Sequence, residues 1–213
     1  MFLLLKRLFD LSFSLILLLS FSLILIFIFI FIKIDSPNDS AIYKGKRAST
    51  NNKTFEILKF RTMLPDAEHT GGFSTSLDDV RLTSIGRKLR KYKLDELPQI
   101  FNILKGEMSF VGPRPQVTYY TDKYFGENLI ILNLKPGIID LASLYFLDMD
   151  STLGKKDVDK KYETEIEPVK NRLRVYYVKN SGIKLDIFIL ISTLLIVFPF
   201  YKRMFDKKIS KII

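Results

Sequence analysis

The chain has 213 residues, a formal net charge of +10 and 47% hydrophobic residues, so its composition is neither that of a disordered chain nor that of an ordinary soluble domain. Cysteine is absent, which excludes disulfides, thiolate metal sites and cysteine nucleophiles. Histidine occurs once, so a serine–histidine–acid triad would need His69 itself. The remaining carboxylates, lysines, arginines and hydroxyl groups favour Mg²⁺-assisted chemistry on phosphates.

The first predicted element is an apolar segment near the N-terminus. The 22 residues from Leu11 to Ile32 carry no charge, and a helix of this length can cross a hydrocarbon core of about 30 Å. The segment is longer than the roughly 7–15 residues of a signal-peptide core, and no small-residue cleavage pattern follows it. We therefore expect the segment to be retained and to bind the protein to a membrane.

The charges on both sides of this segment predict its topology. Lys6 and Arg7 precede it and a longer basic stretch follows it, while lysine and arginine in short loops stay on the cytoplasmic side of a membrane. A helical hairpin that enters and leaves on one face satisfies both flanks, whereas a single spanning helix satisfies only one. The segment contains no proline or glycine, so Ser22, with Ser20, is the candidate for the helix break. We favour the hairpin, with the spanning helix as the alternative.

A β-strand is predicted over residues 54–60, because apolar and polar residues alternate in TFEILKF. Continuing this alternation places Lys59 and Arg61 on one face, roughly 6.6 Å apart, which suits a diphosphate. A solvated strand end is the competing interpretation of these two cations. A polar loop that contains His69 is expected over residues 64–80.

Two short helices are predicted next. The first begins at Thr83 and carries Arg90 on a basic side, a pattern typical of a face exposed to water or anionic lipid. The second covers about residues 96–105, and the glycine that follows is its C-cap. Asp95 and Glu96 lie at its start. In the structural interpretation, Asp95 caps this helix and Glu96 complements the helix dipole.

Arg114 stands between two prolines in the sequence FVGPRP. The proline rings fix the backbone on both sides, so the guanidinium loses little entropy on binding, and its shape suits phosphate oxygens. An incidental exposed arginine in a turn is the alternative. A turn at residues 135–137 and then a strand or short helix are expected, and residues 151–182 are predicted to be helical on either side of Pro168.

A second apolar stretch lies near the C-terminus. Only 14 residues, from Ile187 to Phe200, are free of charge, which is too few to cross a bilayer comfortably. We expect an amphipathic helix at the membrane interface. The predicted division is a membrane-inserted helix at residues 1–34, a cytoplasmic catalytic domain at 35–182, and an interfacial helix with a basic tail at 183–213.

Four blocks of the sequence together resemble the bacterial sugar transferase family of monotopic polyprenyl-phosphate phosphoglycosyl transferases. They are KRLFD with its apolar segment, FEILKFRTM, the 35 residues RLTSIGRKLRKYKLDELPQIFNILKGEMSFVGPRP, and YYVKNSGIKLDI. The third block is highly specific, and the four blocks cover nearly the whole chain. The resemblance implies a predominantly helical α+β fold on the cytoplasmic face of a bacterial inner membrane, with a re-entrant N-terminal helix and an interfacial C-terminal helix.

The resemblance also implies a reaction. A sugar phosphate moves from a nucleotide sugar, with UDP as the expected nucleotide, to polyprenyl (undecaprenyl) phosphate, giving a polyprenyl-diphosphate sugar and UMP. This is the first membrane step in the assembly of a surface glycan such as a capsule, an O-antigen, an exopolysaccharide or a glycoprotein glycan. Membrane lipid is a further implied partner, and downstream glycosyltransferases are candidate partners.

The resemblance assigns roles to individual residues. The adjacent acids of the family fall on Asp95, the nucleophile that forms a phosphosugar–aspartate, and Glu96, which assists with Mg²⁺ or proton handling. Mg²⁺ is the implied cofactor, held by Asp95 and Glu96. The phosphate-binding arginines of the family fall on Arg90 and Arg114.

Two departures from the family pattern concern specific positions. Many members break the membrane helix with Ser-Pro, and the matching residues here are Ser22 and Leu23, so the re-entrant and spanning topologies both stay open. Many members also contain PGITG followed by a Gln-Val-Asn-Gly region, whereas this chain has PGIIDLASLYF. We assign that second change to the sugar or nucleotide pocket.

Electrostatics supports the implied chemistry. A carboxylate and a diphosphate repel each other, so attack on phosphorus needs cations that first neutralise the substrate. The candidate cations are Lys59, Arg61, Arg90, Arg114 and Mg²⁺.

Three other functions compete with this one. A non-catalytic, basic membrane-surface scaffold would bind anionic lipid or partner enzymes and release no nucleotide. An ordinary glycosyltransferase would release the nucleoside diphosphate. Nucleic-acid binding is not expected, because the aromatic residues lie mainly in the membrane segments and the basic residues follow no stacking or groove-reading motif.

Overall fold

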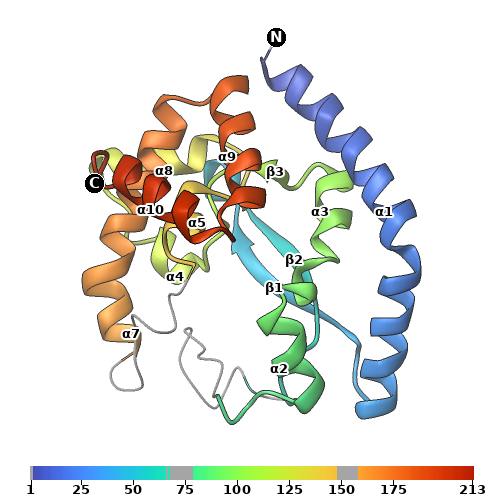
Figure 1. The fold of residues 1–213 in the computed structure, drawn as a ribbon. Helices are drawn as coiled ribbons and strands as arrows, with labels where there is room; N and C mark the ends of the chain where they lie inside the picture. Colours follow the sequence, from blue (N-terminus) through green and yellow to red (C-terminus); the bar gives the residue numbers. More distant parts are fainter. Residues whose placement is uncertain (1, 66, 68–78, 148–157) are drawn as a thin grey trace.

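The computed structural model describes residues 2–65, 67, 79–147 and 158–213. The described part is mostly helical and contains two sheets of two strands each, which confirms the predominantly helical α+β class (Figure 1). Most of the predicted polar loop, including His69, lies outside the described residues.

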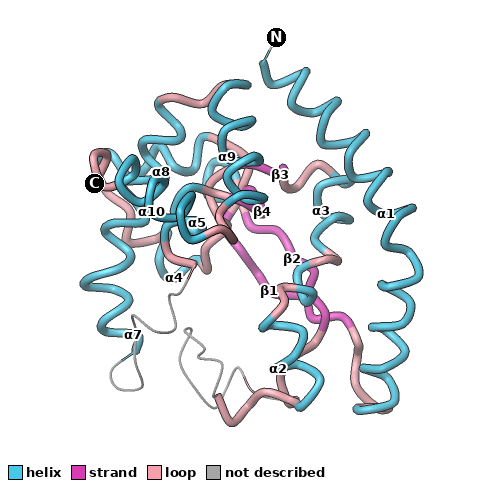
Figure 2. The backbone as a smooth tube through the Cα atoms, viewed as in Figure 1, coloured by secondary structure: helices cyan, strands magenta, loops and turns pink. Residues whose placement is uncertain are grey.

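The elements follow one another along the chain, with η marking 3₁₀ turns except for η4, which is a π-helical turn. They are α1 (Phe2–Asp35), β1 (Ile42–Ala48), η1 (Thr50–Asn52), β2 (Thr54–Phe60), α2 (Ser84–Lys91), η2 (Leu94–Glu96), α3 (Gln99–Lys105), β3 (Ser109–Val111), α4 (Thr118–Thr121), η3 (Gly126–Asn133), β4 (Gly137–Ile139), α5 (Leu141–Tyr145), α7 (Val158–Lys161), η4 (Tyr162–Ile166), α8 (Glu167–Lys179), α9 (Ile183–Leu195) and α10 (Pro199–Ile209). The β1–β2 ribbon crosses the centre of the molecule, with α2 and α3 on one side and α5, α8, α9 and α10 on the other (Figure 2).

The N-terminal helix α1 is continuous over 34 residues and is long and apolar enough to cross a membrane. The helix break predicted at Ser22 is wrong, whereas the choice between a re-entrant and a spanning topology stays a prediction. The Ser22 hydroxyl donates to the Leu19 carbonyl at 3.0 Å inside the helix. The physical reason is that neither proline nor glycine interrupts this stretch, so no backbone hydrogen bond is lost and nothing forces a kink.

Both ends of α1 nevertheless contact the same globular body, on the side where α1 runs in Figure 1. Near the start of α1, Arg7 donates to two carbonyls at the C-terminal end of α3, one of them at 2.8 Å. Asp10 accepts from the backbone N–H of Phe110 at 3.1 Å. Near the end of α1, Ile28 and Ile32 are buried in a cluster with side chains of α2 and β2. Helix α1 therefore contacts both helices that flank the acid pair.

The strand predicted at residues 54–60 is β2, and it pairs antiparallel with β1, which the sequence analysis did not predict. The second sheet pairs β3 with β4 in parallel. Gly112 and Gly137 let these two segments approach closely, because a Cβ atom on Gly137 would lie 2.1 Å from the Gly112 nitrogen. The strand or short helix predicted after the turn at 135–137 proves to be both, because β4 is followed directly by α5.

The predicted helix boundaries around the acid pair are confirmed in part. Thr83 caps α2 by accepting from the Gly86 N–H at 2.9 Å. Gly106, with φ of +83°, ends α3 as predicted. The helix expected from Glu96 is instead the short turn η2 followed by α3, which begins only at Gln99.

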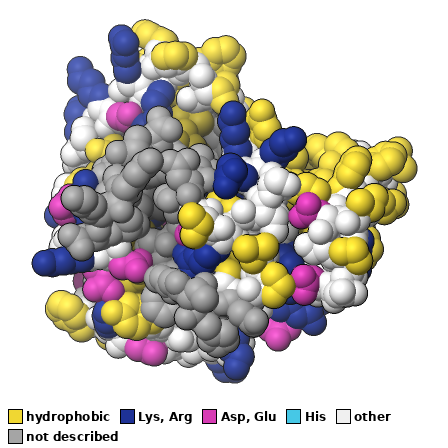
Figure 3. Space-filling view, turned by 90° about the horizontal axis from the view of Figure 1, so that it is seen from below, with side chains coloured by type: hydrophobic (Ala, Val, Ile, Leu, Met, Phe, Trp, Pro, Cys, Tyr) yellow, Lys and Arg dark blue, Asp and Glu magenta, His cyan; other side chains and the backbone are white. Residues whose placement is uncertain are grey.

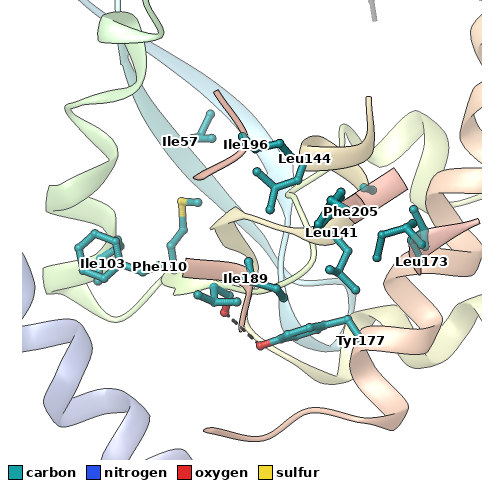
Figure 4. Packing of buried hydrophobic residues seen from close by; sticks show 14 of the residues in the cluster. Ile57, Ile103, Phe110, Leu141, Leu144, Leu173, Tyr177, Ile189, Ile196 and Phe205 are labelled. Atoms are coloured by element: carbon teal, nitrogen blue, oxygen red, sulfur yellow. Dashed lines mark hydrogen bonds between the residues drawn. The ribbon is translucent and has the colours of Figure 1, made fainter. Parts of the chain in front are cut away.

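The C-terminal region belongs to the main core. In place of one interfacial helix, the chain forms α9 and α10. Their inner faces bury Ile189 and Phe205 in the same cluster as Ile57 of β2 and Leu173 of α8 (Figure 4). The boundary predicted at residue 183 therefore does not separate the C-terminal segment from the core.

Two apolar surfaces remain on the outside of the described part. In the middle of α1, Leu19 is 80% exposed, and hydrophobic side chains gather along the edge of the molecule where α1 lies (Figure 3). On the C-terminal helices and their link, Leu194 and Phe200 are 74% and 75% exposed. Contiguous apolar surface of this extent marks a contact with a membrane or a protein partner.

Candidate active site

The acid pair lies in η2, in the bend between α2 and α3. Lys93, just before it, has a φ of +57°, a left-handed conformation that turns the chain after α2. Asp95 is 5% exposed, and its Oδ1 atom has no hydrogen-bond partner among the described residues. Lys93 and Pro98 occupy the N-cap positions of η2 and α3. The interpretation of Asp95 as a helix cap is therefore wrong.

Glu96, its neighbour, is paired with two cations. Its Oε1 atom accepts from Lys59 Nζ at 2.9 Å and also from Arg114 Nη2. Burial alone would raise the pKa of Glu96, but the charges of Arg114 and Lys59 outweigh it and hold the pKa well below its usual range. Glu96 is therefore ionised at neutral pH.

The Asp95 carboxyl has the opposite electrostatic character. Burial raises its pKa, the positive charge of Lys59 lowers it, and the negative charge of Glu96 raises it further. The net pKa lies above the ordinary value for an aspartate. Once ionised, this carboxylate has an oxygen that no described donor stabilises, which makes it the more nucleophilic of the two acids.

Arg114 reaches the acid pair from the loop after β3. Its backbone N–H donates to Asp140 Oδ2 at 3.1 Å, and its Nη1 donates to the Ile138 carbonyl at 3.1 Å. The two flanking prolines, these two bonds and the ion pair with Glu96 together fix the guanidinium. Arg114 is therefore held rigidly, as predicted, and its guanidinium points to Glu96 of the acid pair.

The remaining predicted cations separate into two groups. Arg90, on α2, donates from Nε to the Thr62 hydroxyl at 2.9 Å, and its charge acts on the Asp95 carboxyl. Arg61 lies beyond the end of β2 and donates from Nε to the Ser40 carbonyl at 2.6 Å. The Arg61 guanidinium thus bonds to the loop before β1 and not to the acid pair, and its predicted pairing with Lys59 on a diphosphate stays a prediction.

The structure thus brings together five predicted residues: Lys59, Arg90, Asp95, Glu96 and Arg114. It does not bring Arg61 or Ser22 to this site.

Two buried side chains, Asp140 and Gln99, were not predicted from the sequence. Asp140 fixes the Arg114 backbone, and the only signal for it was its place in the altered PGIID segment. Gln99, four residues after Asp95, is 1% exposed, and neither atom of its amide has a hydrogen-bond partner among the described residues. Buried polar atoms without a partner mark a place for a polar ligand or water.

The donor set near the acid pair is compatible with a magnesium ion. The described residues contain no cluster of three or more His, Cys, Asp or Glu side chains that could hold a metal. Asp95 Oδ1 is a carboxylate oxygen without a described partner, whereas Glu96 Oε1 already accepts from two cations. Mg²⁺ commonly takes one or two carboxylates and completes its coordination with water and substrate phosphates, so these residues fit the ion.

A sequence profile of the bacterial sugar transferases matches residues 1–199. The chain belongs to the bacterial sugar transferase family. This bacterial sugar transferase is 37% identical over 195 residues to the sugar transferase EpsL of Bacillus subtilis, and the match covers 90% of this chain and 86% of EpsL.

Two longer relatives have names that state a reaction. The undecaprenyl-phosphate galactose phosphotransferase of Salmonella typhimurium is 34% identical over 205 residues, covering 89% of this chain and 39% of the relative. The UDP-N-acetylgalactosamine-undecaprenyl-phosphate N-acetylgalactosaminephosphotransferase of Aeromonas hydrophila is 33% identical over 168 residues, covering 76% of this chain and 36% of the relative. This bacterial sugar transferase therefore spans little more than a third of the length of these two relatives.

Proposed function

We propose that this bacterial sugar transferase moves a sugar phosphate from a UDP-sugar to undecaprenyl phosphate, releasing UMP. The observation that carries the proposal is the unpartnered, buried Asp95 carboxylate oxygen beside Lys59, Arg90 and Arg114. The names of the Salmonella and Aeromonas relatives support undecaprenyl phosphate as the acceptor.

The proposed reaction has two displacements at one phosphorus atom. In the first, an Asp95 carboxylate oxygen attacks the phosphorus that bears the sugar. The bond from this phosphorus to the bridging oxygen of the diphosphate breaks, and UMP leaves with that oxygen and its electron pair. In the second, an oxygen of undecaprenyl phosphate attacks the same phosphorus. The phosphorus–aspartate bond breaks, which frees the Asp95 carboxylate and gives undecaprenyl-diphosphate sugar.

The positions of the cations favour Asp95 over Glu96 as the nucleophile. Lys59 and Arg114 bind Glu96, which keeps it charged but lowers its reactivity. The same two cations, with Arg90, lie where they can offset the charge of an incoming diphosphate. Oriented positive groups that stabilise developing charge are each worth roughly 3–4 kcal/mol in other enzymes.

We propose Mg²⁺ as the cofactor, held by Asp95 and Glu96 together with substrate phosphates. When bound, the ion supplies positive charge that neutralises diphosphate oxygens. Lys59 and Arg114 would then hold Glu96 in place, and Arg90 would remain available to the substrate.

We place the globular body on the cytoplasmic face of the inner membrane, with α1 and the outer surface of α9 and α10 in contact with lipid. Both ends of α1 contact one body, so an α1 that crossed the bilayer from end to end would have to detach one end. A monotopic arrangement avoids this. A cysteine introduced by Leu3→Cys, in a chain without other cysteines, should be shielded from an external thiol reagent in intact cells; labelling there would support a spanning helix.

Product analysis tests the proposed reaction. Membranes that contain the protein, a panel of UDP-sugars and undecaprenyl phosphate should release UMP, and stopping the first displacement with acid should leave a phosphosugar on Asp95 that mass spectrometry detects. Release of UDP would indicate an ordinary glycosyltransferase, and no release of nucleotide would indicate a scaffold. Product formation without an adduct at residue 95 would reject the covalent mechanism.

A further inference from the structure

Helix α8 carries an unusual concentration of buried charge. Glu167 and Lys170 are each 7% exposed and Arg174 is 2% exposed. Asp140, between β4 and α5, is also 2% exposed and lies against them. Taking ionised groups out of water is unfavourable, so a cluster of this kind calls for a physical reason. We refer to Asp140, Glu167, Lys170 and Arg174 as the α8 ionic cluster.

Arg174 is the centre of this cluster. Its Nη1 donates to Glu167 Oε1 at 3.0 Å, to Asn171 Oδ1 at 2.8 Å and to the Tyr124 hydroxyl at 3.4 Å. Its Nε lies 3.7 Å from Asp140 Oδ2, at ion-pair distance. Three acceptors on one side thus fix the guanidinium, and its other side faces Asp140.

Asp140 joins the cluster to the active site. Its Oδ1 accepts from the Ser143 N–H at 2.6 Å and caps α5, while its Oδ2 accepts from the Arg114 N–H at 3.1 Å. Glu167, Arg174, Asp140 and Arg114 are thus connected in series, and the Arg174–Asp140 step is an ion pair at 3.7 Å without a hydrogen bond.

We propose that Arg174 and Asp140 are positioning residues of the transferase, which set the direction in which Arg114 is presented to the substrate diphosphate. This inference rests on the proposed function. Without Arg174, the Asp140 carboxylate would keep its two backbone donors but lose the guanidinium that neutralises it in a buried place, where charge is poorly screened. The carboxylate would turn toward water, and the Arg114 backbone would lose its fixed acceptor.

The chain offers a matched pair of substitutions for the test. Arg174→Gln removes the buried guanidinium, and Arg172→Gln makes the same change two residues earlier on α8, where the side chain is exposed. Both are made in the full chain and also together with Arg114→Ala. Circular dichroism and thermal melting establish that each variant is folded.

Two measurements are compared across these variants: binding of UDP by calorimetry, and UMP release from a UDP-sugar. Arg174→Gln should weaken UDP binding and lower kcat/KM by about 10- to 100-fold, as expected for a misplaced substrate-binding group. Arg172→Gln should change neither. In the Arg114→Ala background, Arg174→Gln should change either quantity less than about threefold, because two residues that act through one contact are not additive.

The outcomes that overturn the inference are specific. If Arg174→Gln lowers UDP binding and kcat/KM equally with Arg114 present or replaced, Arg174 has a general structural role. If Arg174→Gln binds UDP as the wild type does, Arg174 does not position Arg114. If Arg174→Gln does not fold, Asp140→Asn carries the same test, since it removes the charge but keeps an oxygen for one backbone donor. A wild-type protein that binds UDP but releases no UMP would reject the proposed function, and the binding measurement would still decide on Arg174.

Discussion

The active site and the α8 ionic cluster both bury charged side chains, but they pair them in different ways. In the cluster, Arg174 Nη1 donates to three acceptors and Asp140 accepts from two backbone N–H groups, while Arg174 Nε and Glu167 Oε2 have no hydrogen-bond partner among the described residues. In the active site, Glu96 is bound by two cations, whereas Asp95 Oδ1 has no partner among the described residues. The two regions meet at Arg114, which bonds to Asp140 through its backbone and to Glu96 through its side chain.

The difference in hydrogen bonding suits the two regions to different roles: the cluster holds a fixed geometry, and the active site presents a reactive carboxylate. A buried charge that makes several hydrogen bonds from one atom, as Arg174 Nη1 does, holds its neighbours in one arrangement, because any rotation breaks several bonds at once. A buried carboxylate oxygen without partners is unfavourable in the resting protein, and in the proposed mechanism bonding to phosphorus relieves that condition. The cluster thus fixes the geometry that the active site uses.

The largest expected effect comes from removing the unpaired carboxylate. Asp95→Asn should lower UMP release at least about 10⁴-fold, because the amide cannot form the phosphosugar–aspartate. Exposed Asp122 provides the matched control, and Asp122→Asn should retain wild-type turnover in the same membranes. Substantial turnover by Asp95→Asn would contradict the assignment of the unpartnered Asp95 carboxylate as the nucleophile.

The next largest loss of activity should come from substituting Arg114, which bonds to both regions. Arg114→Ala should lower kcat/KM by about 10²–10³-fold, since it removes one oriented donor to the diphosphate and frees Glu96 from one of its two cations. Arg87→Ala changes an exposed arginine on α2 and should have little effect. Steady-state UMP release over a range of UDP-sugar concentrations separates a change in KM from a change in kcat. A loss below about threefold would remove Arg114 from the proposed mechanism.

Local sequence signals predicted the elements whose formation depends on nearby residues. The alternation in residues 54–60 gave β2, Thr83 gave the start of α2, and Gly106 gave the end of α3. Each of these signals is a property of a short segment. The break predicted at Ser22 was wrong because no local residue interrupts the helix. The Ser22 hydroxyl donates to the Leu19 carbonyl within the same helix.

The residues of the candidate site were predicted where a motif within one segment indicated them. Contacts between two distant segments were not predicted. The acid pair and Arg114 lie in one highly specific block, so they were found together. The contact of Arg61 with the Ser40 carbonyl was not predicted, since alternation along one strand does not indicate which loop its last side chain meets. The link between Asp140 and Arg174 joins residues 34 positions apart in the chain, and no local pattern in either segment indicates the other.

The stability of the active site should depend on pH through Asp95. Its pKa in the folded protein is raised above the ordinary value of 3.8, so the folded state binds the proton more tightly than the unfolded state. The wild type therefore loses stability as pH rises through the window above 3.8. Asp95→Asn should be more stable by on the order of 1–2 kcal/mol at neutral pH, and the gain should vanish in acid.

Urea unfolding monitored by circular dichroism, with a chelator present so that no divalent cation binds the carboxylate, measures this dependence. The Asp122→Asn protein again serves as the control and should follow the wild type at every pH. A gain for Asp95→Asn that stays constant down to acid pH would mean that the Asp95 charge is not the source of the difference.

Lys170 in the α8 ionic cluster should show the opposite pH dependence. Burial, and then the charge of Arg174, lower the pKa of Lys170 to about 7 against attraction from Asp140 and Glu167, with Arg114 lowering it further. Between about pH 7 and 10.5 the unfolded state binds more protons than the folded state, so wild-type stability rises with pH. Lys170→Met should therefore gain on the order of 1 kcal/mol below pH 7 and lose that gain by about pH 10.

Parallel urea titrations of Lys170→Met and of Lys179→Met, an exposed lysine on the same helix, test this expectation. Only the substitution at Lys170 should give a pH-dependent difference from the wild type. A Lys170→Met protein that gains stability most at alkaline pH would contradict the sign derived from the lowered pKa.

The smallest expected effect concerns the cation that the structure separates from the site. Arg61 donates to the Ser40 carbonyl, outside the group that pairs with the acids, so Arg61→Ala should change kcat/KM by less than about threefold. Lys59→Ala, two residues earlier, should lower it much more, because Glu96 would lose an ion pair that is only partly exposed to water. Equal losses from the two substitutions would show that Arg61 binds the diphosphate when substrate is present, and the boundary of the active site would then extend beyond the end of β2.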